Sequence, residues 1–299
     1  MPFESPAAWR KARSFHHSRY TPEVLHARKQ RISVCLPARN CAATIGPIVA
    51  RCSELRDAQL IDELVVIDGS STDETAAIAA AHGAVVHHEA DLMSAFGPVQ
   101  GKGDAMWRAL SVLDGEIICF LDADLDRFAA HYVTGLVGPL LENDDVEFVK
   151  AFYRRPYRVG GLAVPDGGGR VNHLLARPAL AIFFPGLAGI DQPLAGEVAA
   201  TRALLERIPF TTGYGVEIAM LLDAYDTVGL DGMAQVDLDI HHNSHQPLLA
   251  LSAMAYEVLS VVAERLEREG RLTGFEPSPL LGRERPDPSV ERPPMVAAR

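Results

Sequence analysis

The sequence lacks the segments that would place the protein in or across a membrane. None of its stretches reaches the roughly 18 uninterrupted apolar residues of a membrane span, and the nearest one, residues 178–190, is broken by prolines. The first 20 residues are polar and have no apolar signal core. We therefore expect a cytoplasmic protein with no membrane partner.

Positive charge and cysteine are also scarce. The 39 acidic residues outnumber the 28 basic ones, for a formal net charge of -11, which argues against nucleic acid as a partner. An anionic substrate would then require a local basic patch or a metal ion. The four cysteines form no CxxC pair, so we expect buried thiols rather than a disulfide or a zinc site.

Two nucleotide-binding fingerprints are missing. "QGKGDAMW" around Lys102 is not a P-loop, because Phe96 and Gly103 stand where that motif needs glycine and Ser or Thr. "GGGRVN" does not satisfy GxGxxG, because Asn172 takes the last glycine position. A nicotinamide dehydrogenase is therefore disfavoured.

What the sequence does contain is an alternation of strand and helix patterns. From residue 31 onward, "RISVCLPA", "ELVVID", "AVVHHE", "EIICFLDAD" and "VEFVKAFYRR" read as strands, with helical periodicity between most of them. Ser71 and Glu74 have the spacing of a capping box, and Gly83 is placed to end that helix. The pattern predicts an α/β fold with a mostly parallel, Rossmann-like sheet covered by helices on both faces.

Composition divides the chain into four parts. We expect an N-terminal extension over 1–30, an α/β part over 31–156, a more helical part rich in glycine and proline over 157–275, and a surface arm over 276–299.

Aspartates follow one of the predicted strands. In "CFLDADLDRF", Asp122 and Asp124 stand two apart in an extended segment, so both can face one target. Ligands of open parallel sheets bind beyond the carboxyl ends of the strands. A divalent cation on phosphate oxygens would relieve the repulsion between the two carboxylates. The alternative is a pair of solvated acids that cap the next helix.

Neighbouring strand ends carry further polar groups. Asp68 in "DGSSTDET" could accept hydrogen bonds from a base or ribose, although the segment also reads as an ordinary turn before a capped helix. Lys102 lies between two glycines, where a phosphate could approach closely, or it is a solvated lysine.

The second half adds an anion nest and a histidine cluster. "DGGGRVN" resembles a nest at a helix N-terminus, with Arg170 as a bidentate donor. One of His241, His242 and His245 could join Asp124 at a metal ion. Glu197 and Glu217 each begin a predicted helix, where capping is a serious alternative to a catalytic role.

These motifs together resemble one family. In order and spacing, "PARN", "VVIDGSSTDET", "GKGDAMW", "LDADL", "VKAFYRRP", "GGGRV", "LLARP", "PLAGE", "GYGVEI" and "RPPM" are similar to the glycosyl-3-phosphoglycerate synthases, retaining glycosyltransferases of the GT-A fold in family GT81. The resemblance runs from about residue 30 to residue 296. It implies transfer of a hexose from a nucleotide sugar to the 2-hydroxyl of 3-phosphoglycerate, with Mg²⁺ or Mn²⁺ bound.

The resemblance also implies roles for individual residues. Residues 31–156 would bind the nucleotide sugar, through Pro37, Ala38, Asn40, Asp68, Ser70, Lys102, Asp122 and Ala123. Residues 157–275 would bind the acceptor through Gly169, Arg170 and Asn172, and would complete the metal site of Asp124 with His242. Glu217 would orient the donor sugar, and the backbone at Leu194 and Ala195 would line the reacting centre.

This chain departs from the family pattern in two places. It reads "DADLDRF" where glucosyl-type members carry DSD and an Asn-Pro turn, and an ungapped match places Asn243 at the metal histidine. We therefore favour GDP-mannose as donor, with UDP- or GDP-glucose as the alternative. A GT-A transferase acting on a lipid phosphate and a non-catalytic nucleotide-binding protein remain as competitors. The apolar carboxy-terminal helices also favour a homodimer.

Overall fold

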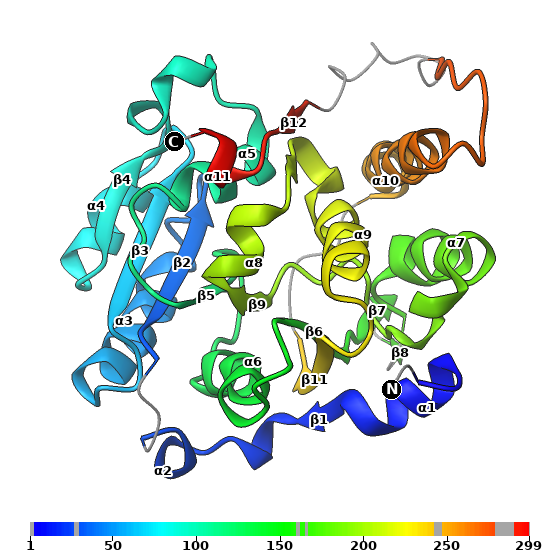
Figure 1. The fold of residues 1–299 in the computed structure, drawn as a ribbon. Coiled ribbons are helices and arrows are strands. Elements are labelled where there is room, and N and C mark those ends of the chain that lie inside the picture. The colour runs from blue at the N-terminus through cyan, green and yellow to red at the C-terminus, as the bar shows by residue number, and fades with distance from the viewer. Residues whose placement is uncertain are drawn as a thin grey trace.

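An eight-stranded sheet forms the centre of the molecule (Figure 1). The computed structural model describes residues 3–26, 30–159, 162–164, 167–241, 247–278 and 290–298. In spatial order the strands are β1 (Ser14–His16), β11 (Met233–Ile240), β6 (Phe148–Arg154), β9 (Val198–Thr201), β5 (Ile117–Phe120), β2 (Ile32–Ala38), β3 (Glu63–Asp68) and β4 (Val85–His88). All neighbours are parallel except β9, which is antiparallel to both β5 and β6.

Helices cover both faces of this sheet, as the sequence predicts. One face packs against α3 (Ile45–Asp57), α4 (Thr75–Ala81) and α6 (His131–Glu142). The other packs against α5 (Gly101–Ala109), α7 (Arg177–Phe183), α8 (Arg202–Arg207), α9 (Val216–Val228) and α10 (Leu248–Arg268). Because both faces are buried, the central strands read as continuous apolar runs, and six of the seven residues of β2 are buried.

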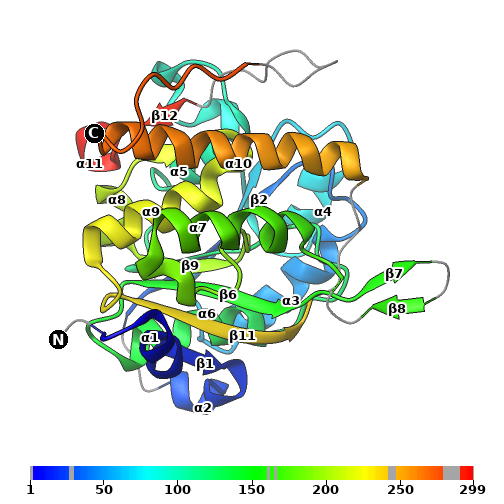
Figure 2. The same cartoon turned by 90° about the vertical axis from the view of Figure 1, so that its right-hand side faces the viewer.

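Shorter elements complete the chain. They are α1 (Pro6–Arg13), α2 (Pro22–Leu25), α11 (Met295–Ala298), the strands β7 (Tyr157–Val159), β8 (Leu162–Val164), β10 (Phe210–Thr211) and β12 (Glu291–Arg292), the 3₁₀ turns η1 (His17–Arg19), η2 (Glu89–Asp91), η3 (Ser94–Phe96), η5 (Pro185–Gly189) and η6 (Gly213–Gly215), and the π-helix η4 (Asn172–Ala176). The β7–β8 hairpin projects from the body of the molecule in Figure 2. No described helix has the length and apolarity to span a membrane.

The N-terminal segment is part of the core. β1 pairs with β11 at the sheet edge, and the fully buried Trp9 donates its indole N–H to the carbonyl of Leu230 at 2.9 Å. The ring of Tyr20 packs on Gly138 of α6, where an added Cβ would fall 2.1 Å from the ring. This segment therefore contributes a strand and two large aromatic side chains, which its polar composition does not predict.

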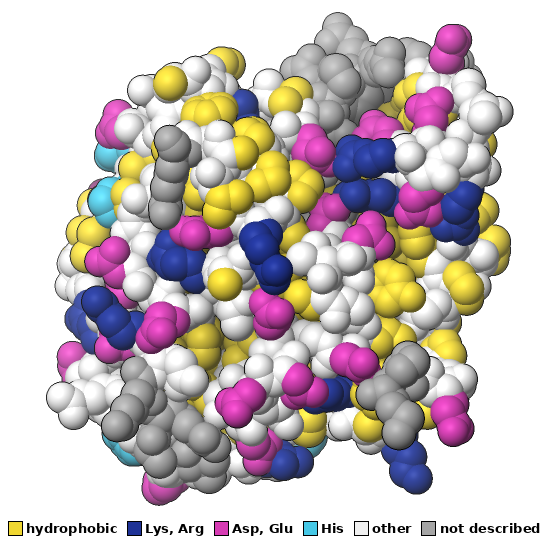
Figure 3. Space-filling view, in the orientation of Figure 1, with side chains coloured by type: hydrophobic (Ala, Val, Ile, Leu, Met, Phe, Trp, Pro, Cys, Tyr) yellow, Lys and Arg dark blue, Asp and Glu magenta, His cyan; other side chains and the backbone are white. Residues whose placement is uncertain are grey.

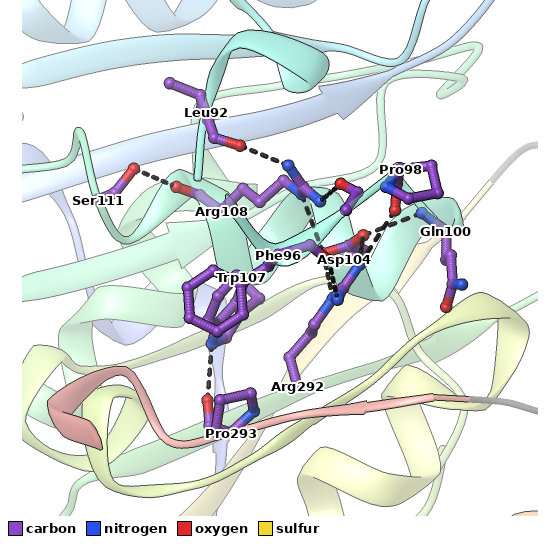
Figure 4. Close-up of polar contacts among 11 residues, drawn as sticks. Leu92, Phe96, Pro98, Gln100, Asp104, Trp107, Arg108, Ser111, Arg292 and Pro293 are labelled. Carbon is purple, nitrogen blue, oxygen red and sulfur yellow. Dashed lines mark hydrogen bonds and ion pairs between the residues drawn. The ribbon is translucent and has the colours of Figure 1, made fainter. Parts of the chain in front are cut away.

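Residues 290–298, here called the C-terminal strap, pack back onto the domain instead of forming the expected surface arm (Figure 4). β12 pairs with β10, and Met295 is fully buried. Arg292 bonds both carboxylate oxygens of Asp104 on α5, and the indole N–H of Trp107 donates to the carbonyl of Pro293 at 2.8 Å. An arginine that satisfies a buried aspartate turns a Pro- and charge-rich segment into part of the core.

Local details confirm some predictions and correct another. Gly83 ends α4 with a φ of +99°, as predicted, and the four cysteines are free thiols, three of them buried. The capping box at Ser71 does not form, because the Ser71 hydroxyl accepts the backbone N–H of Asn40 at 3.0 Å. Asp73 instead accepts the N–H of Thr75 at 3.0 Å. Acidic and basic side chains are interspersed on the face seen in Figure 3.

Candidate active site

The sheet brings the predicted site residues to one edge. β2, β3 and β5 are parallel, so Ala38 and Asp68, the last residues of β2 and β3, and the segment that starts at Asp122, just after β5, lie at the carboxyl ends on the same side. β9 runs in the opposite direction, so Glu197, which precedes its first residue, stands at this edge too. Glu197 therefore begins a strand and not the predicted helix.

A lysine bridges two carboxylates at this edge. The ammonium of Lys102 donates to Asp122 Oδ1 at 2.5 Å and to Glu217 Oε1 at 2.8 Å. Burial alone would lower the pKa of Lys102, but the two carboxylates outweigh it and raise that pKa. Burial likewise works against the ionised form of Asp122, and the charge of Lys102 lowers its pKa overall. These three predicted residues form one ionised cluster; Glu217 lies in the first turn of α9, as expected.

The glycines beside Lys102 are required by close backbone packing and by positive φ angles within the protein. A Cβ at Gly103 would fall 2.0 Å from the carbonyl oxygen of Thr211. Gly101 and Gly213 both have positive φ, +75° and +76°, and the Gly213 N–H donates to the carbonyl of Gln100 at 3.1 Å. The sequence suggests that these glycines let a phosphate approach Lys102 closely. In the structure they are needed in part because the segment that leads into α9 packs against them.

Asp122 is held by a glycine and Asp124 is left facing outward. A Cβ at Gly196 would lie 2.2 Å from Asp122 Oδ2, so this carboxylate rests on the backbone of the "PLAGE" segment. Asp124 is exposed, and no ion pair to it is found within the described ranges. The pKa of Asp124 is raised, mainly because the surrounding protein hinders solvation of its charge and secondly because Asp122 is negatively charged. A hard divalent cation fits such a carboxylate, because it would offset that repulsion.

A buried group of side chains lies behind the two aspartates. Tyr153 donates its hydroxyl to Glu197 Oε2 at 2.9 Å, and its ring stacks on His241 with centroids 4.1 Å apart. His241 Nδ1 lies 3.7 Å from Glu197 Oε1. Burial and then the charge of Asp122 raise the pKa of Glu197 to about 7. Of the three histidines considered as metal ligands, His242 and His245 lie outside the described residues.

The predicted anion nest folds against Arg155 of "FYRRP". The N–H of Gly168 donates to the carbonyl of Arg155 at 2.9 Å, and Gly169 has a φ of +64°. The charge of Arg155 lowers the pKa values of Asp122 and Asp124, although it is a minor cause at each. Arg170 follows Gly169 as the first residue of the next helical segment, directly after the loop that contacts Arg155.

Asn172 has a structural partner that the sequence does not reveal. It is 5% exposed, its Oδ1 accepts the N–H of Leu194 at 3.3 Å, and its Nδ2 donates to the carbonyl of Asp191 at 3.3 Å. Ala195, which is buried, follows Leu194, and its N–H donates to Gln192 at 3.1 Å. Asn172 thus links the predicted acceptor loop to the predicted reacting centre.

The predicted nucleotide loops also interlock. Asn40 and Ser70 adopt positive φ values of 53° and 57°, and Asn40 Oδ1 accepts the N–H of Thr72 at 2.8 Å. Pro37 and Ala38 end β2, and the carbonyl of Ala123 accepts the hydroxyl of Thr44 at 2.7 Å. Asp68 is buried, and its Oδ1 lacks a hydrogen-bond partner in the described part of the chain. A buried acceptor of this kind suits a ligand N–H or hydroxyl.

Three residues of the site are missed by the motif reading. They are Lys150, Tyr153 and Gly196. A signal for Lys150 is present, since it is the one charged residue among the six of "FVKAFY". For Tyr153 and Gly196 the sequence carries no comparable signal, because their roles depend on contacts with Glu197 and Asp122 from other strands.

A second cluster of ligand-type side chains is better explained by ion pairing. Atoms of His16, His17 and Asp239 lie within 4.8 Å of one another. However, His16 Nδ1 accepts the N–H of Ser18 at 3.2 Å, so a neutral His16 carries its proton on the Nε2 that faces Asp239. Arg154 also lies 3.7 Å from Asp239. A protonated nitrogen and a guanidinium both oppose a cation there.

Comparisons with known proteins agree with this geometry. Residues 33–167 match Glycosyl transferase family 2. The chain is 41% identical to the glucosyl-3-phosphoglycerate synthase of Petrotoga mobilis, over 95% of this chain and 93% of that protein. The crystal structure of mannosyl-3-phosphoglycerate synthase from Rubrobacter xylanophilus is similar over 100% of both chains, with 42% identity and a TM-score of 0.91. That of glucosyl-3-phosphoglycerate synthase from Mycobacterium tuberculosis with Mn²⁺, UDP-glucose and phosphoglyceric acid covers 93% of this chain and 94% of its own, with 40% identity and a TM-score of 0.80.

The mixed sheet and the site at its strand ends define a hexosyltransferase of the GT-A fold. Identity over nearly the whole chain is more specific than the fold. The chain belongs to the glycosyl-3-phosphoglycerate synthases, which confirms the resemblance seen in its motifs.

Proposed function

We propose that the enzyme transfers glucose from UDP-glucose to the 2-hydroxyl of 3-phosphoglycerate, with retention of configuration and with Mg²⁺ or Mn²⁺ bound. The observation that carries the proposal is the Lys102, Asp122 and Glu217 cluster at the strand ends, with the Arg155 and Gly168 contact beside it. The M. tuberculosis relative holds Mn²⁺, UDP-glucose and phosphoglyceric acid together. The names of the relatives support glucose over the GDP-mannose that the sequence favours.

Each side chain has a part suited to its position. Asp124 and His242 would hold the divalent cation, which when bound offsets charge on the departing diphosphate. Lys102 supplies a second positive charge for that diphosphate, and Arg170 binds the acid groups of 3-phosphoglycerate in a bidentate manner. Glu217, already an acceptor for an ammonium, accepts donor-sugar hydroxyls. Positioning of two anionic substrates then provides much of the rate.

Around these groups, the loop residues bind the rest of each substrate. Pro37, Ala38, Asn40, Asp68 and Ser70 surround the nucleoside, and Ala123 lies between the two aspartates. Gly169 offers its backbone N–H to the acceptor, and Asn172 holds the backbone of Leu194, and with it the adjoining Ala195, beside the reacting carbon. Glu217 is engaged with Lys102, so we assign it to sugar binding and not to a covalent double displacement.

A donor panel tests this proposal. Purified enzyme with 3-phosphoglycerate and Mg²⁺ or Mn²⁺ receives UDP-glucose, GDP-glucose or GDP-mannose separately, and product is detected by mass spectrometry. We expect glucosyl-3-phosphoglycerate from UDP-glucose. Asp124→Asn should reduce its formation by about 10²- to 10³-fold, whereas Asp126→Asn, an exposed neighbour, should not. Transfer to a lipid phosphate but not to 3-phosphoglycerate, or no transfer at all, would overturn the proposal.

Mannose is the second candidate donor sugar. It is favoured by the R. xylanophilus mannosyl-3-phosphoglycerate synthase structure, which superposes on this chain with a TM-score of 0.91. The pocket contacts that separate the two hexoses are worth about 1 to 3 kcal/mol, so a preference of about 10- to 200-fold would identify the donor. The GDP-mannose arm of the panel measures this preference directly.

The same proposal includes a homodimer. Leu248 and Leu249 at the start of α10 and Ile182 of α7 are 69–73% exposed. Further along α10 there is a groove of about 220 Å³ that Phe183, Leu259, Val262 and Leu272 help to line. An apolar surface of this kind, formed by α7 and α10, suits a second copy of the chain. Analytical ultracentrifugation should find a dimer that Leu248→Lys dissociates. Val85→Lys, an equally apolar exposed position on β4, should leave the dimer intact.

A further inference from the structure

Lys150 is a buried cation on the floor of the site. It lies in the middle of β6, paired with Val198 of β9 and Gln235 of β11, and it is 1% exposed. Its ammonium has no hydrogen-bond partner among the residues that the structure describes. An unpaired buried charge is costly, so a lysine retained at such a position calls for a physical explanation.

The side chain of Lys150 faces the helices that carry the ionised cluster. Successive side chains of a strand point to opposite faces, and Val149 and Ala151 belong to the core beneath α3 and α6. Lys150 therefore shares the face of Phe148, which belongs to the core that α5, α7, α8, α9 and α10 cover. Two of these helices, α5 and α9, carry Lys102 and Glu217 in their first turns.

The charges that act on Lys150 are those of the site. Burial lowers its pKa to about 8, and the carboxylate of Glu217 is the foremost of those that oppose this effect. Glu197 and Asp122 act in the same direction, while Lys102 adds to the lowering. Lys150 thus lies within electrostatic reach of the carboxylates that Lys102 neutralises, on their buried side.

The two lysines differ in what they can do when substrate binds. Lys102 is partly exposed and, under the function proposed above, provides charge to the donor diphosphate. A lysine that interacts with phosphate interacts less strongly with Glu217, which would then be left as a poorly solvated carboxylate. Lys150 is enclosed and cannot leave, so its charge continues to act on Glu217.

We propose that Lys150 is a positioning residue, an internal counter-ion that keeps the Glu217 carboxylate aimed at the donor sugar while Lys102 binds the diphosphate. The inference rests on the proposed function, because it requires a nucleotide sugar in the site. Because Lys150 acts through Glu217 on the hexose, its removal should weaken binding of a nucleotide sugar and leave binding of the nucleotide alone unchanged.

Binding calorimetry in the presence of Mn²⁺ tests this difference with UDP and UDP-glucose as the two probes. Lys150→Met removes the charge and keeps the length of the side chain. We expect the Kd for UDP-glucose to rise about tenfold, as coupling through one contact predicts, and the Kd for UDP to change by less than about twofold. Thermal unfolding should give a Tm equal to or above that of the wild type, because a buried charge is removed.

A double-variant cycle provides the control. In a Glu217→Gln background, Lys150→Met should have no further effect on UDP-glucose binding, because the carboxylate that it serves is gone. If Lys150→Met does not fold, Lys150→Gln takes its place with the same expected ratio of Kd values. Equal losses for UDP and UDP-glucose, or effects that add in the double variant, would show a merely structural role. A wild-type enzyme that binds neither probe would overturn the proposed function and the inference together.

Discussion

Among the residues of the C-terminal strap, Arg292 is the one whose substitution should most weaken the attachment of the strap to the domain. Its guanidinium donates to both oxygens of Asp104, at 2.9 and 2.6 Å, and to the carbonyls of Phe96 and Pro98, at 2.7 and 3.1 Å (Figure 4). Arg292→Met keeps most of the aliphatic stem and removes all four hydrogen bonds. The aspartate is fully buried, so the perturbation falls on an ion pair out of contact with water.

The size of the effect follows from the partners that stay in place. Breaking a buried ion pair costs about 3 to 5 kcal/mol when the abandoned charge has no other partner. Asp104 would keep the side chain of Arg108, at 3.1 Å, and the N–H of Gln100, at 2.9 Å, so we expect about 3 kcal/mol. With an unfolding entropy of about 2.1 cal/mol/K per residue, a chain of 299 residues should lose about 5 °C in Tm.

Scanning calorimetry measures this difference, and a second arginine provides a matched control. Arg268 pairs with Glu291 of the same strap at 2.9 Å, but both side chains are exposed, so Arg268→Met should cost less than about 1 kcal/mol. The strap also adjoins the segment that packs on Gly103, so Arg292→Met should raise the KM for the donor. Equal Tm values for the two variants would refute the reasoning.

Three further predictions concern the site. Arg170→Lys should raise the KM for 3-phosphoglycerate in steady-state kinetics through loss of bidentate binding, and an equal rise in the donor KM would contradict this. Gly196→Ala should abolish transfer while the protein stays folded by circular dichroism, because its Cβ would lie 2.2 Å from Asp122 Oδ2; full activity would show that the contact is adjustable. Burial lowers the pKa of Lys150 from 10.5 to about 8, so its destabilisation is complete below pH 8 and disappears as the pH rises toward 10.5. The Tm advantage of Lys150→Met over wild type should therefore shrink between pH 7 and pH 10, and a constant difference would contradict that assignment.

The parts of the fold that depend on local pattern could be read from the sequence. β2 and β3 are apolar, rich in β-branched residues and bounded by polar turns, so their positions follow from composition alone. The strand-end rule then correctly placed Asp68 and Asp122 on one edge of the sheet. The family resemblance, which assigns Lys102 to the nucleotide and Glu217 to the donor sugar, implied that the two residues share a site, and they are in contact.

The parts that depend on distant contacts could not be read in this way. Glu197 follows a glycine, which suggested a helix start, but pairing of β9 with β5 and β6 makes the next residues a strand. The burial of Arg292 depends on Asp104, which stands 188 positions earlier in the chain. The Ser71 capping box was lost to a competing partner, the N–H of Asn40, on a neighbouring loop.

The reversed direction of β9 has a consequence for protein engineering. Within the sheet, the four strands from β5 to β4 meet the three from β6 to β1 only through β9, which is in register with four residues on one side and three on the other. Hybrids assembled from two relatives would have to preserve this short seam and the helix α6, which packs on β5, β6 and β11 across it. Exchanging one block of strands at a time would then show which half of the enzyme selects the nucleotide and which the hexose.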